Sequence, residues 1–194
     1  MILYNGPTSP FGRTTKVTML ELELPVEEKV VDVYTADFLD HKNPLRQIPT
    51  LELRDGTVIY DSRVICRYFD SVSSKDTLYP EADLWGVETR TALAIGIMEA
   101  GLQRRMEILR PEGEKSPGFI QKLETRIDRA LDHLEKLVDK LAVKALTMDQ
   151  IVAACALGYT DFRYGDGWRK RCPRLDAWSR DFAKRPSMQA TEPK

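Results

Sequence analysis

The chain contains few cysteines and histidines, the residues that form disulfides or bind metals in small proteins. Its three cysteines, Cys66, Cys155 and Cys172, are odd in number and widely spaced, so they do not suggest a disulfide framework. This usage favours a reducing cytoplasm. We expect all three to be structural, although Cys172 lies beside arginines and could also be an exposed thiol. The two histidines, His41 and His133, have no partner at the spacing of metal ligands, so we expect no metal site.

Long apolar runs and charge of one sign are also missing. No run approaches the roughly 20 residues of a membrane-spanning helix, and no basic stretch precedes the apolar N-terminal residues as in a secretory signal. The net charge of −1 excludes the strongly basic surface typical of nucleic-acid-binding proteins. The 194 residues, 42% hydrophobic and 30% charged, are typical of a soluble globular protein with one large domain or two small ones.

Hydrophobic periodicity divides the chain into two halves. Up to residue 72, strand and helix signals alternate. We expect strands at 2–4, 26–33, 50–53 and 58–60, helices at 10–23 and from 62 onward, and an irregular segment at 35–43. The first two strands flank a helix, so they should be parallel. This half is predicted to be a small α/β domain over residues 1–72.

The second half has helical signals only. A polar, turn-rich linker at 73–83 precedes an all-helical domain at 84–194. Helices are expected at 85–109, 117–141, 151–162 and 173–184. The third of these is apolar on nearly every face and should lie at the centre, and Thr147 to Gln150 has the spacing of a capping box before it. The fold class is therefore α/β followed by all-α.

The segment 43–62 contains two backbone features that suit a small peptide ligand. Pro49 precedes a short strand and has no N–H for a sheet, and the Ile48–Pro49 bond can be cis at low cost. Asp55-Gly56, between the apolar runs 50–53 and 58–60, predicts a hairpin. After this hairpin, Asp61 or Ser62 can cap the next helix, whose N-terminal N–H groups suit a carboxylate. Together they predict a binding edge for a small peptide.

Several segments, in this order and spacing, resemble one known family. They are Ser-Pro-Phe-Gly-Arg at 9–13, the stretch 43–49, Asp-Ser at 61–62, and in the second half 96–102, 155–159, 161–163 and 184–187. The chain resembles the glutathione S-transferase superfamily over essentially its whole length, and its bacterial YibF-like branch in particular. The resemblance implies a thioredoxin-like first domain, a helical-bundle second domain, a homodimer, and a role in detoxification.

The resemblance also implies a glutathione-binding site. Pro49 should be a cis-proline, and the backbone of Ile48 should pair with the cysteinyl unit of glutathione. Asp61 should hold the γ-glutamyl ammonium and Ser62 its carboxylate, while Gln47 should lie near the glycyl end. Two departures from the family pattern affect this site: Arg46 replaces the usual glycine, and Asp61 is shorter than the usual glutamate.

Glutathione attacks as a thiolate, and Ser9 is placed to stabilise that charge. It begins a helix whose dipole favours an anion, and a hydroxyl donating to the sulfur favours the thiolate by roughly 1.5–3 kcal/mol, or about one to two pKa units. Thr8 is the nearest substitute and Tyr4 a more distant one. Ser9 alone could equally be a helix cap. No cysteine lies near residue 9, which argues against thiol–disulfide exchange.

The expected function is conjugation or substitution of reduced glutathione at a small electrophilic substrate. Phe11, Met98, Leu102 and Arg105 are candidates for the electrophile pocket, although the apolar stripe of that helix equally suits a core. Two alternatives remain open: a glutathione-binding protein with little catalysis and a regulatory or interaction role, and a glutathione-dependent reductase.

Overall fold

The computed structural model describes residues 1–193, which form two compact units. Unit 1 contains residues 1–78 together with the C-terminal residues from 190 onward, and unit 2 contains residues 79–189. The division falls inside the segment 73–83 that the sequence assigns to a linker. The C-terminal end departs from the sequence assignment, because Thr191 belongs to unit 1 and accepts a hydrogen bond from Arg13 Nε at 3.3 Å. Residue 194, the predicted end of the helical domain, lies outside the described residues.

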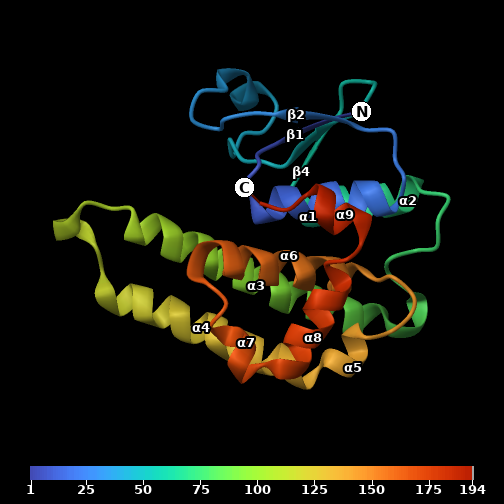
Figure 1. Cartoon of the computed structure of the whole chain (residues 1–194). Coiled ribbons are helices and arrows are strands. Elements are labelled where there is room, and N and C mark those ends of the chain that lie inside the picture. Colours follow the sequence, from blue (N-terminus) through green and yellow to red (C-terminus); the bar gives the residue numbers. More distant parts are fainter. Residues whose placement is uncertain (194) are drawn as a thin grey trace. The chain divides into compact units, whose positions relative to one another are not determined.

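Unit 1 is built on a four-stranded mixed sheet with the strand order β2-β1-β3-β4 (Figure 1). The strands are β1 (Ile2–Asn5), β2 (Glu27–Val30), β3 (Thr50–Glu52) and β4 (Val58–Tyr60). β1 and β2 are parallel, which confirms the expectation for strands joined by a crossover helix. β3 is antiparallel to both β1 and β4.

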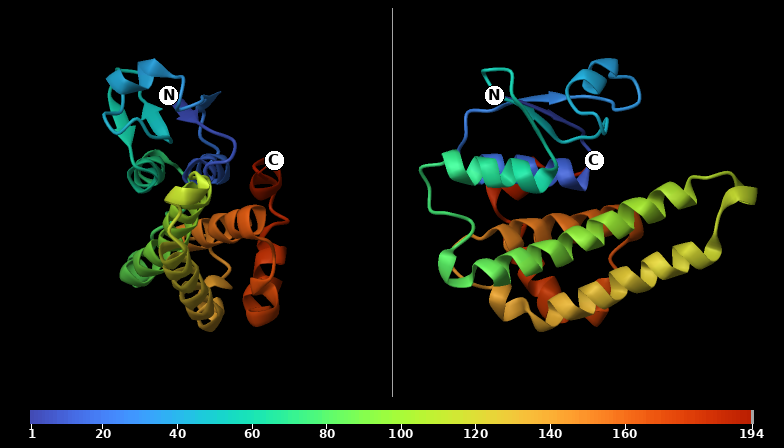
Figure 2. Two further views of the ribbon diagram at one scale, coloured as in Figure 1. Left: turned by 90° about the vertical axis from the view of Figure 1, so that its left-hand side faces the viewer. Right: turned by 180° about the vertical axis from the view of Figure 1, so that it is seen from behind.

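Two helices, α1 (Pro10–Glu21) and α2 (Ser62–Val72), lie side by side on the same face of this sheet (Figure 2). They bury an apolar core against the strands, and each of its largest members has 0% exposure: Leu3, Leu51, Ile65 and Phe69. The unit is thioredoxin-like, as the resemblance implies.

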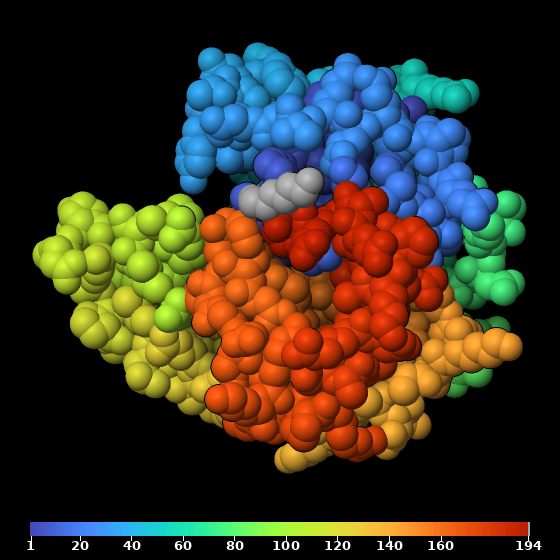
Figure 3. Space-filling model, viewed as in Figure 1, coloured from blue at the N-terminus to red at the C-terminus, as the bar shows by residue number. Residues whose placement is uncertain are grey.

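The segment between β2 and β3 is the least regular part of unit 1. β2 is shorter than the predicted 26–33, because it forms the sheet edge and Val30 is 66% exposed. The segment then forms a short 3₁₀ helix, Asp37–His41, anchored by the fully buried Leu39. Its residues, light blue in Figure 3, pack together into one outer surface.

Unit 2 is helical throughout its described length. Its helices are α3 (Leu84–Ile108), α4 (Pro117–Lys136), α5 (Val138–Leu141), α6 (Met148–Tyr164), α7 (Trp168–Arg171) and α8 (Pro173–Phe182), followed by α9 (Pro186–Ala190), whose last residue belongs to unit 1. The predicted helix 117–141 breaks at Leu137 into α4 and α5. The sequence pattern does not predict α7 and α9, because four or five residues carry too little periodicity.

The central position of α6 is confirmed, since twelve of its residues are buried. At its start, the Thr147 N–H donates to Gln150 Oε1 at 2.9 Å. Asp149, with 0% exposure, pairs with Arg90 of α3 at 2.5 Å. Within residues 1–193, no helix combines the length and the apolarity that crossing a membrane requires.

Candidate functional site

The sheet register brings three predicted binding elements to one edge of unit 1. Tyr4 at the end of β1 lies opposite Thr50 at the start of β3, and Thr50 lies opposite Tyr60 at the end of β4. The segments that continue from these residues therefore leave the sheet at the same end. They contain Ser9, the Ile48–Pro49 pair, and the Asp61–Ser62 pair.

The width of this edge matches a short peptide. Neighbouring strands lie about 4.8 Å apart, so the row from β1 across β3 to β4 is about 10 Å wide. An extended tripeptide spans about 10 Å as well. The sheet edge can therefore present a contact to each residue of a tripeptide at once.

Ser9 is the N-cap of α1, and its Oγ accepts a hydrogen bond from the Gly12 N–H at 3.1 Å. A serine hydroxyl has one donor proton and two acceptor lone pairs. The cap uses one lone pair, so the proton remains available to donate to an anion. The bonded N–H and the positive end of the helix dipole both favour that donation. The cap and the predicted thiolate-stabilising role are therefore compatible at the same residue.

The two substitutes for Ser9 differ in availability. Tyr4 is 7% exposed, and its hydroxyl donates its only proton to Glu52 Oε2 at 2.7 Å. Burial and the Glu52 carboxylate raise the pKa of Tyr4 to about 12. The Lys42 ammonium lies 2.7 Å from the same oxygen. The Tyr4 hydroxyl is therefore already bonded in a cluster with Glu52 and Lys42, whereas Thr8 is exposed.

The peptide bond between Ile48 and Pro49 is cis, as the resemblance implies. Among the described residues, the backbone N–H and C=O of Ile48 make no hydrogen bond. The Ile48 side chain instead packs against Gly6, where a Cβ would lie 2.5 Å from Ile48 Cδ1. The backbone of Ile48 can thus pair with an added strand-like ligand.

Two buried asparagines hold the loops around this edge, and neither is among the site residues predicted from the sequence. Asn43 Nδ2 donates to the backbone oxygen of Gln47 at 2.9 Å and to Thr50 Oγ1 at 3.0 Å. Asn5 Nδ2 donates to the Gly12 backbone oxygen at 3.1 Å, and its Oδ1 accepts from the Gly6 N–H at 2.9 Å. An asparagine next to a proline or glycine is the available sequence signal, because its amide can replace missing backbone partners.

Asp61 is the N-cap of α2, with its side chain accepting from the Arg63 N–H at 2.8 Å. The Arg63 guanidinium also binds it, with 2.9 Å between Nη2 and Oδ2, and this contact lowers the pKa of Asp61. A carboxylate offers about four lone-pair sites, so it retains capacity for an ammonium. Asp61 has φ +69°, in a region of backbone conformation that residues other than glycine rarely adopt.

Ser62 follows at the first position of α2 and is 8% exposed. Within residues 1–193, its hydroxyl and its N–H have no hydrogen-bond partner. Both groups stand at the positive end of a helix, which suits a carboxylate. The structure thus leaves Ser62 ready to donate twice to an anion.

Arg46 is tied into unit 1 and does not extend freely into solvent. It adopts φ +47°, which explains why glycine is usual at this position. Its Nε donates to the Val33 oxygen at 3.0 Å, and Nη2 and Nη1 bind Asp37 at 2.8 Å and Asp40 at 2.9 Å. The next residue, Gln47, has an exposed side chain. Arg46 therefore braces the loop that carries Gln47 and Ile48.

The four predicted pocket residues have different surroundings. Phe11, in unit 1, is half-buried. In unit 2, Met98 has 0% exposure and belongs to the core, whereas Leu102 is 39% exposed and Arg105 is half-buried. The burial of Met98 fits the alternative in which the apolar stripe of this helix belongs to a core.

The cysteines are free thiols and all three are buried. Burial also raises the pKa of the Cys172 thiol. In the part of the chain that the structure describes, no three His, Cys, Asp or Glu side chains are grouped as metal ligands. The chemistry-bearing groups at the sheet edge are hydroxyls, N–H groups and one carboxylate.

The comparison with protein families gives two matches. Residues 8–72 match the model of the glutathione S-transferase N-terminal domain, and residues 117–181 match that of the C-terminal domain. The first match contains the cis-proline and both helix starts described above.

Relatives of known sequence or structure align over the whole chain. The chain is 33% identical to the uncharacterized GST-like protein YibF of Escherichia coli K12, covering 100% of this chain and 98% of YibF. A glutathione transferase family member from Pseudomonas fluorescens Pf-5, solved with bound glutathione, is 36% identical with a TM-score of 0.95, covering 100% and 98% of the two chains. A glutathione S-transferase from Methylobacillus flagellatus KT, solved with glutathione bound, is 30% identical with a TM-score of 0.95, covering 100% and 99%. By these matches and by its fold, the chain belongs to the glutathione S-transferase superfamily, in the branch that includes YibF.

Proposed function

We propose that this protein is a glutathione transferase that joins reduced glutathione to a small electrophile. Ser9 is the catalytic residue, and its hydroxyl donates to the thiolate. Glutathione lies along Ile48 and Pro49, with its γ-glutamyl end at Asp61 and Ser62 and its glycyl end near Gln47. The observation that carries the proposal is the Ser9 hydroxyl, which accepts a hydrogen bond from the Gly12 N–H and keeps its own proton for an anion.

The physical argument concerns the pKa of the glutathione thiol. An ordinary thiol has a pKa of about 8.5, so little thiolate is present at pH 7. A charge-assisted hydrogen bond and a helix N-terminus both favour the anion. The bond alone accounts for about one to two pKa units, which brings the thiol near neutrality.

The test compares Ser9→Ala with Ser9→Thr, since threonine retains both the hydroxyl and the ability to cap. Thiolate formation is measured from its ultraviolet absorbance as the enzyme–glutathione complex is titrated. Ser9→Ala is expected to raise the apparent thiol pKa by about one to two units and slow turnover near neutral pH about tenfold or more. Ser9→Thr should retain most of both. If Ser9→Ala titrates and turns over as the wild type does, the role of Ser9 is refuted.

A glutathione-binding protein with little catalysis is the second candidate. The N–H groups of Ile48 and Ser62, which have no hydrogen-bond partner among residues 1–193, favour binding whether or not chemistry follows. Calorimetry with glutathione, followed by assays with several aryl and alkyl electrophiles, separates the two functions. Saturable binding without turnover of any electrophile would favour this candidate, and absence of binding would reject both.

A glutathione-dependent reductase has less support. Its mixed disulfide would need an accessible thiol, whereas Cys66, Cys155 and Cys172 are 1% exposed or less. The reductase function would regain support if the variant with all three cysteines replaced by serine kept activity on a glutathione mixed disulfide.

A bound adduct narrows the electrophiles worth assaying. The Pseudomonas fluorescens relative, 36% identical to this chain, has also been solved with S-(propanoic acid)-glutathione. That adduct carries a carboxylate on the group attached to sulfur. Small electrophiles with a carboxylate are therefore the first class to test on this protein.

We also propose a cytoplasmic homodimer. Three free cysteines fit a reducing compartment. Unit 1 exposes apolar side chains on β4 and α2, with Tyr60 37% and Val64 52% exposed, which suits a subunit interface. Sedimentation at micromolar concentration should give the mass of two chains, and Val64→Glu should shift it toward one. A wild-type protein that sediments as one chain would reject the dimer.

A further inference from the structure

Unit 2 contains a cavity between α5, the loop that follows it and α8. Its volume is about 540 Å³, within the range of about 300–1,000 Å³ that is usual for small-molecule sites. α5 and α8 are in contact, and their labels lie next to each other in Figure 1. Every lining residue lies between positions 138 and 185, so the cavity belongs to unit 2 alone. It shares no residue with the sheet edge of unit 1.

The floor of this cavity is apolar and held in place. Val138, Leu141 and Phe182 line it, and all three are buried. Beside them, the Gln150 amide donates to the Leu141 oxygen at 2.6 Å and to the Val143 oxygen at 3.0 Å. These two bonds tie the loop to the end of α5. The cavity is therefore already formed in the folded unit.

Two aromatic side chains of α8 form one wall. Trp178 and Phe182 lie one helical turn apart, with ring centroids 5.2 Å apart and ring planes at 33°. The Trp178 Nε1 donates to the Leu141 oxygen at 3.2 Å, which fixes the half-buried indole and uses its only polar group. What this ring offers to the cavity is apolar aromatic surface. A flat ring of a ligand can stack on such a surface.

Positive charge predominates around the cavity. Its charged lining residues are three cations and one acid: Lys144, Arg174, Arg185 and Asp181. The acid is paired with Lys184 at 3.1 Å. Arg174 binds Asp139, and Arg185 Cζ lies 5.3 Å from the Phe182 ring centroid. Within residues 1–193, Lys144 has neither a carboxylate within 4 Å nor a ring contact. Its ammonium is therefore available to an anion.

We propose that this cavity is a second ligand site of the protein, for a small flat aromatic acid. The ring of the ligand lies against Trp178, and its carboxylate or sulfonate binds the Lys144 ammonium. Both residues line the same cavity, so one molecule can contact both. The inference does not depend on the proposed transferase function, because it uses no residue of unit 1.

Other classes of ligand match the lining less well. A cationic ligand would meet three positive charges and one acid that is already paired. A sugar phosphate would find the ammonium, but it would place hydroxyl groups against a floor that cannot bond them. An aliphatic acid would gain the apolar contact without the stacking on Trp178. The aromatic acid is the class that uses the floor, the ring and the charge together.

Calorimetry with two probes tests the charge. Naphthalene-2-sulfonate carries the anion, and naphthalene-2-sulfonamide has the same rings but no charge near neutral pH. The wild type is expected to bind one sulfonate per chain, and to bind the sulfonamide about fivefold more weakly. Lys144→Gln should bring this ratio close to one. Lys140→Gln, which changes an exposed lysine of α5 outside the lining, should leave it intact. A wild type that binds neither probe, or a wild-type ratio in Lys144→Gln, overturns the inference.

Substitutions on α8 test the position of the ring. Trp178→Leu should weaken both probes about equally, since it removes the stacking surface and leaves the charge. Ala177→Glu places a carboxylate at an exposed lining position and should weaken the sulfonate about tenfold. Ala183→Glu, exposed and outside the lining, is its control. Circular dichroism verifies folding, and Ala177→Glu decides if Trp178→Leu does not fold. Wild-type affinity for the sulfonate in Ala177→Glu would show that the ligand lies elsewhere and refute the site.

Competition distinguishes this cavity from the proposed transferase site. The sulfonate titration is repeated with saturating S-hexylglutathione, whose alkyl chain would occupy the space next to the glutathione sulfur. The sulfonate affinity should be unchanged. Displacement of the sulfonate would mean that it occupies the electrophile site, and the inference would be wrong. If the protein binds no glutathione compound at all, the transferase proposal fails, and the Lys144 and Ala177 variants still decide the cavity.

Discussion

Two buried asparagines in unit 1 and one buried ion pair in unit 2 hold their surroundings in different ways. In unit 1, Asn5 and Asn43 are each 2% exposed, and they donate to and accept from the backbone of loops. In unit 2, Arg90 at 8% exposure and Asp149 at 0% form an ion pair between two helices. A neutral amide can satisfy irregular backbone in both directions, whereas an ion pair joins two elements that are already regular.

This difference separates binding from stability. The amides of unit 1 hold the loops that present Ser9 and Ile48, so their loss should weaken ligand binding. The ion pair of unit 2 holds α3 against α6, so its loss should destabilise the helices first. The four predictions below test that separation in order of decreasing effect.

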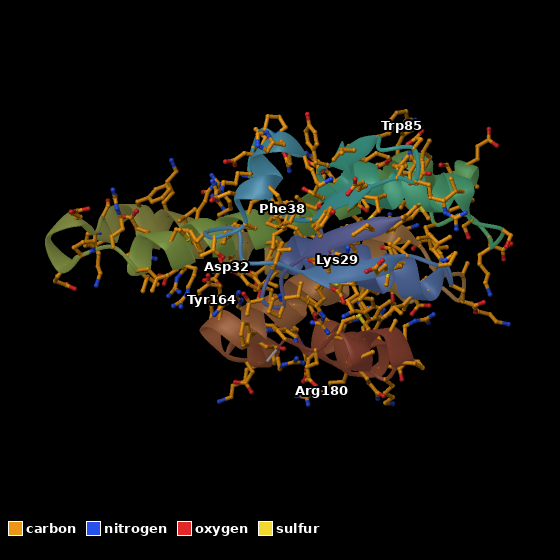
Figure 4. The ribbon with its side chains drawn as sticks, turned by 90° about the horizontal axis from the view of Figure 1, so that it is seen from above. Lys29, Asp32, Phe38, Trp85, Tyr164 and Arg180 are labelled. Atoms are coloured by element: carbon orange, nitrogen blue, oxygen red, sulfur yellow. The ribbon has the colours of Figure 1, made fainter. Side chains whose placement is uncertain are left out.

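Asp149→Ala should have the largest effect on stability. It leaves the Arg90 guanidinium buried without its closer partner, which typically costs about 3–5 kcal/mol. The three tryptophans, at positions 85, 168 and 178, all belong to unit 2, so their fluorescence during urea unfolding reports on this unit. Trp85, 80% exposed at the start of α3, is labelled in Figure 4.

Asp83→Ala is the matched control, since Asp83 is the other acidic partner of Arg90 at 2.8 Å but its side chain is 53% exposed. Its effect should be much smaller. Glutathione affinity, measured well below the unfolding transition, should stay unchanged in both variants. Equal destabilisation by the two substitutions would contradict the importance of the buried pair.

Asn43→Ala should weaken glutathione binding, which the two unit 2 variants leave unchanged. It removes the donor to the Gln47 oxygen and the acceptor for the Leu45 N–H, which lies 3.0 Å from Oδ1. Lost buried hydrogen bonds cost about 1–3 kcal/mol, and the released loop should weaken glutathione binding about tenfold. Calorimetry measures the affinity, and Asn43→Asp, which keeps the acceptor alone, should fall between the two. Unfolding at lower urea with unchanged affinity would show that Asn43 serves stability only.

Much of the fold could be predicted because its signals are local. The Asp-Gly hairpin, the proline at the start of α1 and the apolar run of α6 each specify one element from a few residues. The break at Leu137 and the short α7 and α9 were not predictable in this way. They depend on packing between helices distant in sequence, which periodicity does not report.

The site could be predicted only in part, for a similar reason. Ser9, Ile48 and Ser62 occupy recognisable motifs at element ends. The roles of the buried amides depend on contacts that only the folded chain forms, such as the one between Asn5 and the Gly12 oxygen, seven positions apart. Arg46 shows the limit most clearly, because its two aspartate partners lie in an irregular segment with no periodic pattern.

Tyr4→Phe tests whether a hydroxyl near the sheet edge, but already bonded, matters for function. Losing its bond to Glu52 should cost about 0.5–1.5 kcal/mol. The folded-state pKa of Tyr4, about 12, lies above the ordinary tyrosine value of 10.0, so the protonated hydroxyl favours the folded state. Wild-type stability should therefore decline further as pH rises from about 10 to about 12, and this additional decline should be absent in Tyr4→Phe.

Urea unfolding at a series of pH values measures this difference, with Tyr60→Phe, at an exposed position, as the control. Turnover by Tyr4→Phe should follow the wild-type pH profile up to pH 9, in contrast to Ser9→Ala. A Tyr4→Phe profile that matches Ser9→Ala would transfer the thiolate role from Ser9 to Tyr4.

Arg46 should give the smallest effect, because glycine and alanine separate two opposing contributions there. Both substitutions remove the contacts with Asp37, Asp40 and the Val33 oxygen, but only glycine accepts φ +47° without a steric penalty. Arg46→Gly should therefore unfold at slightly lower urea than the wild type, and Arg46→Ala at lower urea still. Glutathione affinity should fall in the same order, since both variants loosen the loop before Ile48. Tighter glutathione binding by Arg46→Gly than by the wild type would contradict this prediction. It would show that Arg46 restricts the loop and that its presence in place of glycine reduces glutathione affinity.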